Sequence, residues 1–319
     1  MKQRRVLVTG GTGFLGRAIV RQLRKRGAEV TSVGSDMVDL TDEVAAMTFL
    51  DKHLRSAELV IHCAAVCGGI GANMRLPLTM AIDNARMAAN VVEWCLWHTV
   101  PLIGVGTVCS YPKHCPAPFC EADLWNGYPE ETNAPYGNAK RMLLEFMRAA
   151  GRNAQLPWLW SYVIPANLYG PGDNFSEGFS HVIPAMIRRF VEATESRLPY
   201  VTCWGTGQAT REFLYVDDAA DAIATMAEHV GDVDLVNIGS GDEIDIRRLA
   251  YLIAELTGYD GQIQWNESMP DGQPKRVLDS SLLHSVTGWR PSVKLVDGLR
   301  RTIEWYHANK DSAVSPAAS

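Results

Sequence analysis

The stretch VTGGTGFLG, residues 8–16, joins a short apolar run at 5–9 to an amphipathic helical pattern at 14–26. In a strand–turn–helix unit of this kind, spaced glycines allow a tight turn, close approach of a pyrophosphate to the backbone, and close packing of the helix on the strand. The N–H groups and the dipole at the start of the helix favour an anion. We therefore expect a dinucleotide to bind here, in contact with Gly10, Gly11, Thr12, Gly13, Phe14, Leu15 and Gly16.

Strand and helix patterns alternate through the first half of the chain. Apolar, β-branched runs occupy residues 5–9, 30–33, 59–62, 102–105 and 158–164. Helical patterns lie between them, and the clearest are at 78–98 and 135–150. Strands that alternate with helices predict a parallel sheet with helices on both faces. The expected fold class is α/β, with a doubly wound, Rossmann-type sheet formed mainly by residues 1–165.

The pattern changes in the second half of the chain. Turn-rich stretches, YGPGDN at 169–174 and WGTG at 204–207, separate shorter elements, which predicts a smaller mixed α/β lobe for a substrate over residues 166–309. A strand-like run at 233–238 is expected to return to the main sheet. The tail at 310–319 is rich in Ala, Ser and Pro, and we expect it to be disordered.

Composition limits the class of protein. The 319 residues allow one large domain or two joined ones, at roughly 150 residues per domain. A net charge of −6 argues against a nucleic-acid binder, and no run reaches the roughly 18 apolar residues of a membrane span. The seven cysteines include no C-x-x-C pair, so we expect no metal site. No secretory signal pattern is evident, so we expect reduced thiols and a cytoplasmic location.

A second motif, YGNAK at 136–140, places Tyr136 and Lys140 four residues apart on one face of a helix. A phenol has a pKa of about 10, and a neighbouring ammonium lowers it. Tyr136 is then suited to pass a proton to or from a sugar oxygen while a hydride moves at the carbon. The glycine spacing and this motif together resemble the short-chain dehydrogenase/reductase superfamily in its extended form.

Longer motifs narrow the resemblance. They are GGIGAN at 68–73, CSYPK at 109–113, NLYGP at 167–171, DNF at 173–175, SHVIPA at 180–185, REFL at 211–214 and PDG at 270–272. Over nearly its whole length, the chain resembles the GDP-L-fucose synthases. The resemblance implies an enzyme that epimerises C3 and C5 of GDP-4-keto-6-deoxy-mannose, or of a close relative, and reduces C4.

The same resemblance implies roles for individual residues. Thr107 stands where the family has a serine, and it would bond the substrate oxygen beside Tyr136 and Lys140. Cys109 and His181 match the family's epimerisation residues, which remove a proton beside the C4 ketone and return one on the opposite face. Taken alone, Cys109 would be read as a small buried side chain and His181 as a helix cap or core residue. The flanking motifs favour the catalytic roles.

Further positions are expected to bind the cofactor. Pro165 and Leu168 would frame the nicotinamide, and Asp39 with Leu40 resembles a pair that contacts the adenine. The other positions expected on the cofactor side are Ser35, Asp36, Cys63, Ala64 and Ala65.

The expected substrate is a GDP-sugar. Asn167 would contact the sugar, and Trp204 belongs to a motif that continues the resemblance. A diphosphate suits the planar fork of a guanidinium. The candidates for it are Arg189 and Arg211, together with Lys275 or Arg276, and the alternative for any single one is a solvated surface charge.

The form of the cofactor is left open. The family's phosphate loop carries His and Arg where this chain has Gly11 and Thr12, and its arginine after the second strand is missing from VGSD at 33–36. A 2′-phosphate calls for a cation, whereas Asp36 could accept a hydrogen bond from a ribose hydroxyl. The resemblance implies NADPH, and the residues favour NAD(H).

Other functions remain open as well. A redox-neutral epimerase would keep NAD bound, and a plain 4-ketoreductase would act on a related GDP-sugar such as a heptose. A cofactor-sensing binding protein is a further alternative, against which the complete set of Thr107, Tyr136 and Lys140 argues. Helices 78–98 and 135–150 correspond to the pair that commonly forms dimers in this superfamily, so we expect a homodimer. The tryptophans expected to serve packing alone are Trp94, Trp97, Trp158 and Trp160.

Overall fold

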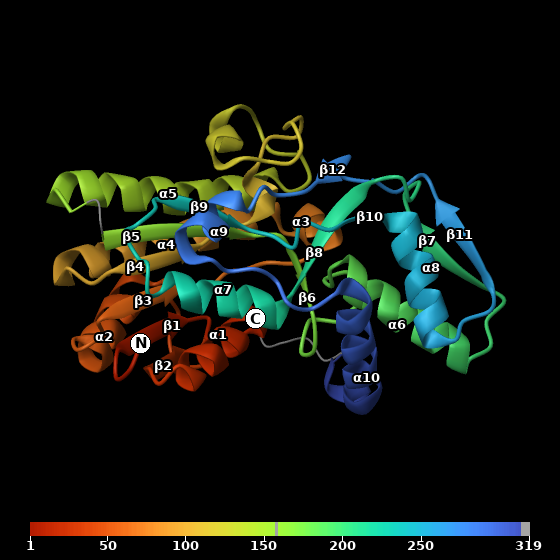
Figure 1. The fold of residues 1–319 in the computed structure, drawn as a ribbon, viewed down its shortest axis with the longest axis horizontal. Helices are drawn as coiled ribbons and strands as arrows, with labels where there is room; N and C mark the ends of the chain where they lie inside the picture. Colours follow the sequence, from red (N-terminus) through yellow and green to blue (C-terminus); the bar gives the residue numbers. More distant parts are fainter. Residues whose placement is uncertain (157–158, 314–319) are drawn as a thin grey trace.

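The computed structural model describes residues 1–156 and 159–313 (Figure 1). Its main sheet has six strands, all parallel, in the order β2-β1-β3-β4-β5-β9. They are β1 (Arg5–Thr9), β2 (Glu29–Val33), β3 (Leu59–His62), β4 (Leu102–Val105), β5 (Trp160–Pro165) and β9 (Leu235–Ile238). Strands β3, β4, β5 and β9 are buried along their whole length, as a parallel sheet covered on both faces requires. The expected doubly wound α/β sheet is confirmed.

Helices cover the sheet in two layers. Helix α1 (Phe14–Lys25) packs against α7 (Val216–Met226), whereas α4 (Pro77–His98) packs against α5 (Ala134–Ala154) and α2 (Glu43–Leu54). The strand order reverses at β1, which has β2 on one side and β3 on the other. Right-handed crossovers then place the two sets of helices on opposite faces of the sheet. Figure 1 shows the long helices α4 and α5 side by side.

The carboxyl ends of the strands meet at one edge of the sheet. Thr9 lies beside Val33 on one side and beside His62 on the other. Val105, at the end of β4, lies beside Val163 in β5. Because the chain leaves β1 and β3 toward opposite faces, this edge is the place where open α/β sheets bind their ligands.

The other strands form a second, smaller lobe of mixed α/β structure. Strands β6 (Asn167–Tyr169), β10 (Glu243–Asp245) and β12 (Lys275–Arg276) all pair with β8 (Thr210–Tyr215), and only β10 does so antiparallel. Strands β7 (Tyr200–Trp204) and β11 (Gln262–Asn266) form a separate parallel pair. The expected mixed lobe is therefore present.

Three helices give this lobe its own hydrophobic core. They are α6 (Val182–Glu195), α8 (Ile246–Thr257) and α10 (Leu295–Ala313). The core includes Phe190, Ile253, Leu299 and Tyr306, and the ring of Tyr306 stacks on Phe175 with centroids 4.6 Å apart. The short helices of the chain are α3 (Ile70–Arg75), η1 (Val108–Ser110), η2 (Glu121–Trp125) and α9 (Ser281–Thr287).

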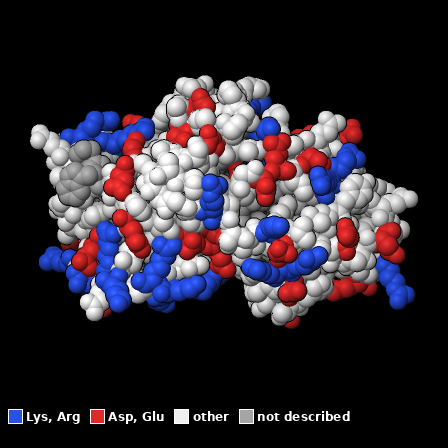
Figure 2. All heavy atoms as spheres, viewed as in Figure 1, with Lys and Arg blue, Asp and Glu red and all other residues white. Residues whose placement is uncertain are grey.

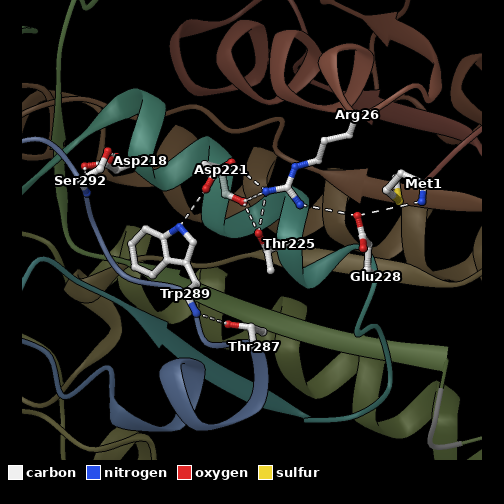
Figure 3. A network of polar contacts seen from close by, with 9 residues as sticks. All are labelled: Met1, Arg26, Asp218, Asp221, Thr225, Glu228, Thr287, Trp289 and Ser292. Atoms are coloured by element: carbon white, nitrogen blue, oxygen red, sulfur yellow. Dashed lines mark hydrogen bonds and ion pairs between the residues drawn. The ribbon is translucent and has the colours of Figure 1, made fainter.

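Helix α7 comes from the second half of the chain but packs in the core of the main sheet. Arg26, at the end of α1, donates from Nη2 to Asp221 (2.7 Å) and to Thr225 (2.8 Å) of α7, and its Nη1 lies 3.6 Å from Glu228 (Figure 3). Asp221 also accepts a hydrogen bond from the indole of Trp289 (3.2 Å). These contacts hold three segments that are far apart in the sequence on one face of the sheet.

Charged side chains of both signs are interspersed on the face shown in Figure 2. Helix α1 is rich in basic side chains, including Arg17, Arg21 and Arg24, and α7 supplies acidic partners such as Asp217, which pairs with Arg21. Within the described residues, no helix is long and apolar enough to cross a membrane.

The expectation of a disordered tail from residue 310 is wrong for its first four residues. Beyond a kink at Asn309, residues 310–313 are helical; Lys310 pairs with Glu195, and the carbonyl of Ala313 accepts from the Phe175 N–H (3.3 Å). These contacts with the second core extend the helix despite its Ala- and Ser-rich sequence. Residues 314–319 lie outside the described residues.

The expectations about the tryptophans are partly wrong. Trp94 and Trp160 are buried, as expected, and Trp158 lies outside the described residues. Trp97, however, is 61% exposed. The buried stripe of α4 runs through Val91 and Trp94 and leaves Trp97 on the solvent side of the last turn.

Candidate active site

The phosphate loop has the geometry that a pyrophosphate needs. Gly10 has a φ of +66°, and a Cβ there would lie 2.7 Å from the backbone of Ala64, just after β3. A Cβ on Gly16 would collide with the carbonyl oxygen of Gly10. Gly13 is the N-cap of α1, and no side chain among the described residues caps this helix. Its first N–H groups are thus left for a ligand, so residues 10–16 fit a dinucleotide.

The residues after β3 lie where the sequence predicts. The N–H of Cys63 donates to the carbonyl of Thr9 (3.1 Å), and the N–H of Ala64 donates to the Thr9 hydroxyl (3.4 Å). Residues 63–65 therefore run directly beside the phosphate loop. Burial raises the pKa of the Cys63 thiol to about 12, so this cysteine offers a neutral surface to a ligand.

The turn after β2 lies against the phosphate loop. Ser35 and Asp36 are exposed. The carboxylate of Asp36 and the side chain of Thr12 both crowd Gly34, where an added Cβ would collide with each of them. An acidic side chain at this turn suits a ribose hydroxyl better than a 2′-phosphate.

Asp39 and Leu40 make contacts within the protein. The Asp39 carboxylate accepts from the N–H (2.8 Å) and the hydroxyl (2.7 Å) of Thr41, and these bonds lower its pKa. The carbonyl of Leu40 accepts from the amide of Asn90 (2.9 Å). The Asp39 carboxylate therefore stabilises its own turn, and the structure does not direct it to a ligand.

A cation that the sequence did not lead us to expect lies at the phosphate loop. Arg17, in α1, donates to the carbonyl of Thr12 (2.9 Å) and to the carbonyl of Gly172 (3.1 Å). Gly172 belongs to the turn after β6, so Arg17 links the phosphate loop to the second lobe. Arg17 stands one helical turn after Gly13, and this spacing could have indicated from the sequence that its side chain lies at the phosphate loop.

The expected hydroxyl and phenol come from adjacent elements. Thr107 follows β4 and caps η1, and its Oγ1 accepts from the Cys109 N–H (3.3 Å). Tyr136 lies in the first turn of α5, next to Gly137. A Cβ on Gly137 would be 2.5 Å from the Cys109 carbonyl oxygen. The start of α5 therefore packs directly on the turn that carries Thr107 and Cys109.

The electrostatics at Tyr136 differ from the expectation. Lys140 is buried and donates from Nζ to the Val105 carbonyl (3.0 Å), and burial lowers its pKa. Burial raises the pKa of Tyr136 well above 10, and the nearby sulfurs of Cys67 and Cys109 raise it further. Desolvation of the phenolate is the main cause of this shift, and the lowering expected from Lys140 is not found among the described residues. The phenol holds its proton, as a proton donor must.

The thiol of Cys109 lies among side chains from distant segments. Its Sγ is 3.3 Å from Nη1 of Arg276 and 4.0 Å from Oδ1 of Asn133. Asn133 donates to the carboxylate of Glu130 (2.7 Å), and Arg276 donates from Nε to Gln273 (2.9 Å). Sequence spacing gave no sign of these neighbours, since Arg276 is 167 residues away from Cys109.

The GGIGAN stretch positions His181. A Cβ on Gly69 would collide with the carbonyl oxygen of Ser180, so the glycine allows this loop to lie directly against the residue before His181. His181 is the N-cap of α6 and reaches solvent. Although His181 has an exposed surface, the protein around its imidazole removes enough water to lower its pKa, and the charge of Arg276 lowers it further. Arg276 thus acts on both Cys109 and His181.

Only one of the two alternatives at residues 275–276 lies with the other site residues. Arg211 and Arg276 face each other across β8 and β12, and both are buried. Burial, and then the charge of Arg276, lowers the pKa of Arg211 to about 9; its Nη2 donates to the carbonyl of Asp271 (3.0 Å). Lys275 instead pairs with Glu243 (2.7 Å). The structure therefore groups Arg276, and not Lys275, with Arg211.

The remaining expected residues lie in the second lobe or at its junction with the sheet. The guanidinium of Arg189 lies over the ring of Trp204, 5.8 Å from its centroid. Asn167 donates to the carbonyl of Glu212 (2.9 Å), which fixes the start of β6 on β8. The last two expected cofactor neighbours belong to the same two strands, since Pro165 ends β5 and Leu168 lies within β6.

At the carboxyl edge of the parallel sheet, a glycine loop suited to a dinucleotide lies near a hydroxyl, a protonated phenol and a buried lysine. This combination is typical of Rossmann-type dehydrogenases and epimerases. Comparison with protein families gives the same class. The chain belongs to the NAD dependent epimerase/dehydratase family, whose model matches residues 6–239.

Individual proteins are similar over nearly the full chain. GDP-L-fucose synthase 1 of Arabidopsis thaliana is 39% identical over 97% of this chain and 94% of its own length. A GDP-L-fucose synthetase from Naegleria fowleri, solved with NADP bound, is 27% identical with a TM-score of 0.87, covering 99% of this chain and 96% of that one. A GDP-6-OMe-4-keto-L-xylo-heptose reductase from C. jejuni is 25% identical with a TM-score of 0.88, covering 97% and 99%.

Proposed function

We propose that the protein is an epimerase-reductase that converts GDP-4-keto-6-deoxy-mannose, or a close relative, by epimerisation at C3 and C5 and reduction at C4 with NAD(P)H. The observation that supports this proposal is that the chain carries two sets of side chains suited to proton transfer. Thr107, Tyr136 and Lys140 suit the reduction, and Cys109 with His181 suits the epimerisation. The names of the similar proteins, above all the A. thaliana GDP-L-fucose synthase, support this substrate class.

A dinucleotide held by residues 10–16 would supply the hydride for reduction at C4. Tyr136 gives its phenolic proton to the C4 oxygen as negative charge develops there. The Thr107 hydroxyl, held at the end of β4, donates a hydrogen bond to the same oxygen. Lys140, tied to the Val105 carbonyl, keeps its ammonium on the face of α5 that carries Tyr136. The raised pKa of Tyr136 keeps the donor protonated at neutral pH.

Epimerisation uses the acidity that the C4 ketone gives to the protons at C3 and C5. Cys109 stands at the end of β4 and His181 at the start of α6, so the two groups come from different lobes. Such an arrangement suits removal of a proton from one face of the sugar and return of a proton to the other. The solvent contact of His181 gives it a source of replacement protons.

A plain 4-ketoreductase on a related GDP-sugar is the second candidate. The observation that favours it is the close structural similarity to the C. jejuni heptose reductase. The presence of Cys109 beside Arg276 favours the epimerase-reductase instead, because reduction alone has no use for a thiol at this position.

The cofactor form belongs to the proposal too. We infer that NADH is accepted about as well as NADPH, because Asp36 and Ser35 occupy the turn where a 2′-phosphate calls for a cation. The N. fowleri structure contains NADP, which supports NADPH as one of the accepted forms.

We also infer a cytoplasmic homodimer. The seven cysteines are free thiols, which suits a reducing compartment. Helices α4 and α5 expose apolar side chains, among them Leu78, Ile82, Trp97 and Met142.

The decisive experiment supplies GDP-4-keto-6-deoxy-mannose with NADPH or NADH in heavy water and identifies the product by NMR and mass spectrometry. The proposal expects deuterium at C3 and C5 and one equivalent of oxidised cofactor for each product. Incorporation without net oxidation would identify a redox-neutral epimerase. Oxidation without incorporation would identify a plain 4-ketoreductase.

Two variants separate the halves of the reaction. Cys109→Ser and His181→Gln are expected to slow deuterium incorporation at C3 and C5. Both should still reduce an already epimerised sugar within about tenfold of the wild-type rate, because general acid–base groups act on their own step. Unchanged incorporation in both variants would show that neither residue takes part in epimerisation.

A further inference from the structure

Arg276 is held in a fixed position beside Cys109. It is 6% exposed, and its Nη1 lies 3.3 Å from the Cys109 sulfur. Its Nε donates to Gln273 Oε1 (2.9 Å). Gln273, 1% exposed, donates in turn to the carbonyls of Pro112 (2.8 Å) and Lys113 (3.2 Å), which lie on the same loop as Cys109. The guanidinium is therefore anchored to the segment that carries the thiol.

The remaining nitrogen of this guanidinium has no use in the fold. Nη2 of Arg276 is buried and has no hydrogen-bond partner among the described residues. Leaving a charged donor unpaired in the interior is costly, so such groups are typical of sites that act on a ligand or a reacting group. Arg211 is also buried and lies beside Arg276 on the paired strand β8. Burial and the charge of Arg276 both lower the pKa of Arg211.

One cation thus acts on both members of the proposed epimerisation pair. The guanidinium disfavours a positive charge on His181, whose pKa is lowered by desolvation first and by Arg276 second. A guanidinium that donates to a sulfur favours the thiolate over the thiol. Arg276 is therefore placed to support negative charge that develops on the Cys109 sulfur, and it makes a protonated His181 a stronger acid.

We propose that Arg276 is a positioning residue for proton exchange at C3 and C5, and that it works through the Cys109 sulfur and not by binding the nucleotide diphosphate. This inference rests on the proposed function. In each exchange the thiolate takes a proton from the carbon: the C–H bond breaks, the S–H bond forms, and the electron pair moves into the enolate of the C4 ketone. Protonated His181 then returns a proton to the carbon from the other face, and both groups regain their starting forms by exchange with water.

The first test measures the thiol directly and needs no substrate. Iodoacetamide alkylates thiolates, so the rate at Cys109, followed by peptide mass spectrometry, reports how much thiolate the site holds. Arg276→Met is expected to slow alkylation of Cys109 at pH 7 at least about tenfold, and Arg276→Lys to restore it to within about threefold, since an adjacent opposite charge favours the ionised form by that order. Cys120 in the same samples should react at an unchanged rate, which checks the fold.

Lys275→Met is the matched control for this measurement. It removes the neighbouring cation of β12, which pairs with Glu243 and makes no contact with the thiol in the described structure. The alkylation rate of Cys109 should therefore stay at the wild-type value. An equal loss in Lys275→Met and Arg276→Met would mean that net charge alone acts on the thiol, and it would overturn the inference.

The second test separates the two possible uses of Arg276. If it acts on Cys109, Arg276→Met lowers the maximal rate of deuterium incorporation at least about tenfold and leaves both KM and the reduction of an epimerised sugar within about threefold. If it binds the diphosphate, the variant instead raises KM for both half-reactions and leaves Cys109 alkylation unchanged, which would overturn the inference. If the wild-type protein incorporates no deuterium at all, the proposed function fails, while the alkylation test still judges the contact between Arg276 and Cys109.

Discussion

Burial is the main influence on the pKa of Tyr136. The phenol lies in the first turn of α5, against the turn that carries Cys109, and desolvation raises its pKa well above 10. The YGNAK motif correctly predicts that phenol and ammonium share a helix, but it does not show how deeply α5 is buried. A phenol that keeps its proton is suited to reduction, in which the C4 oxygen needs a proton.

Tyr136→Phe keeps the ring and deletes the proton that the reduction requires. We expect the rate of C4 reduction to fall at least about 10²-fold, the size of a general-acid contribution, while dinucleotide affinity changes little. Because the pKa is raised, the wild-type rate should not decline through ionisation of Tyr136 between about pH 6 and 9. Stopped-flow measurement of cofactor oxidation checks both points, and near wild-type turnover would remove Tyr136 from the mechanism.

Ser35 offers a test of the cofactor form. Charge-assisted hydrogen bonds contribute about 1.5–3 kcal/mol each, or roughly tenfold to a hundredfold in affinity. Without one at this turn, we expect kcat/KM for NADPH to exceed that for NADH less than about tenfold, or to be the lower of the two. Ser35→Arg should shift the ratio toward NADPH at least about tenfold.

Met37→Arg is the matched control, because it adds the same charge to the same exposed turn two residues further on. Its ratio of kcat/KM values should remain close to that of the wild type. A wild-type preference for NADPH above about a hundredfold would show that another cation, such as Arg17, reaches the 2′-phosphate.

Asp173 gives a pH-dependent prediction about stability. It is 6% exposed, and burial raises its pKa from 3.8 to about 7. Between about pH 4 and 7 the folded protein holds a proton that the unfolded chain has lost, so this group lowers stability as pH rises. Asp173→Asn removes the charge and should raise the free energy of unfolding by roughly 2–4 kcal/mol at pH 8, with little effect near pH 4. Urea unfolding at the two pH values tests this, and an equal effect at both would contradict it.

Helices and strands are the part of the molecule that the sequence predicts best. The strands at 59–62 and 102–105 have the expected bounds, because a strand buried on both faces is an unbroken apolar run with turn residues at each end. The tail from residue 310 was expected to be disordered, but its first residues are helical because they contact Phe175 and Glu195, which the local pattern does not include. Trp97 shows the same limit, because its exposure depends on which stripe of α4 faces the core.

Arg26 tests how firmly α7 is held on α1. It bonds Asp221, Thr225 and Glu228 at once and is about three-quarters buried (Figure 3). Arg26→Met is expected to lower the free energy of unfolding by about 1–2 kcal/mol. Arg24→Met is the control, two residues earlier in the chain. It removes only a hydrogen bond to the Val30 carbonyl and should lower the free energy of unfolding by about 0.5 kcal/mol or less. Equal urea midpoints for the two variants would show that the network adds no stability.

The whole molecule brings together residues that no local pattern connects. The motifs predicted Thr107, Tyr136, Lys140, Cys109 and His181 as site residues, and the structure places Cys109 directly on the start of α5. The motifs did not predict that Arg276 meets Cys109, because β12 reaches the site only after the second lobe has folded back beside β8. Long-range contacts of this kind depend on the topology of the fold, which residue spacing along the sequence does not reveal.

Assembly is the last property that the exposed surface predicts. On α4, Leu78 and Ile82 are 69% and 39% exposed, and Trp97 is 61% exposed. Leu78 and Ile82, four residues apart, share one face of α4, Trp97 lies near the other end of the helix, and α5, packed beside α4, exposes Met142. Exposed apolar side chains on a helix pair are typical of an interface between subunits.

The wild-type protein should therefore behave in solution as a particle of about twice 35.1 kDa. The double variant Leu78→Asp, Ile82→Asp places two charges on this face of α4. Burying unpaired charges in a subunit interface is unfavourable, so we expect the variant to be monomeric at micromolar concentration. Tyr251→Asp changes an equally exposed apolar side chain on α8 and should leave the dimer intact. Light scattering after size exclusion gives both masses. A monomeric wild-type protein, or a double variant that stays dimeric, would place the subunit contact elsewhere or remove it.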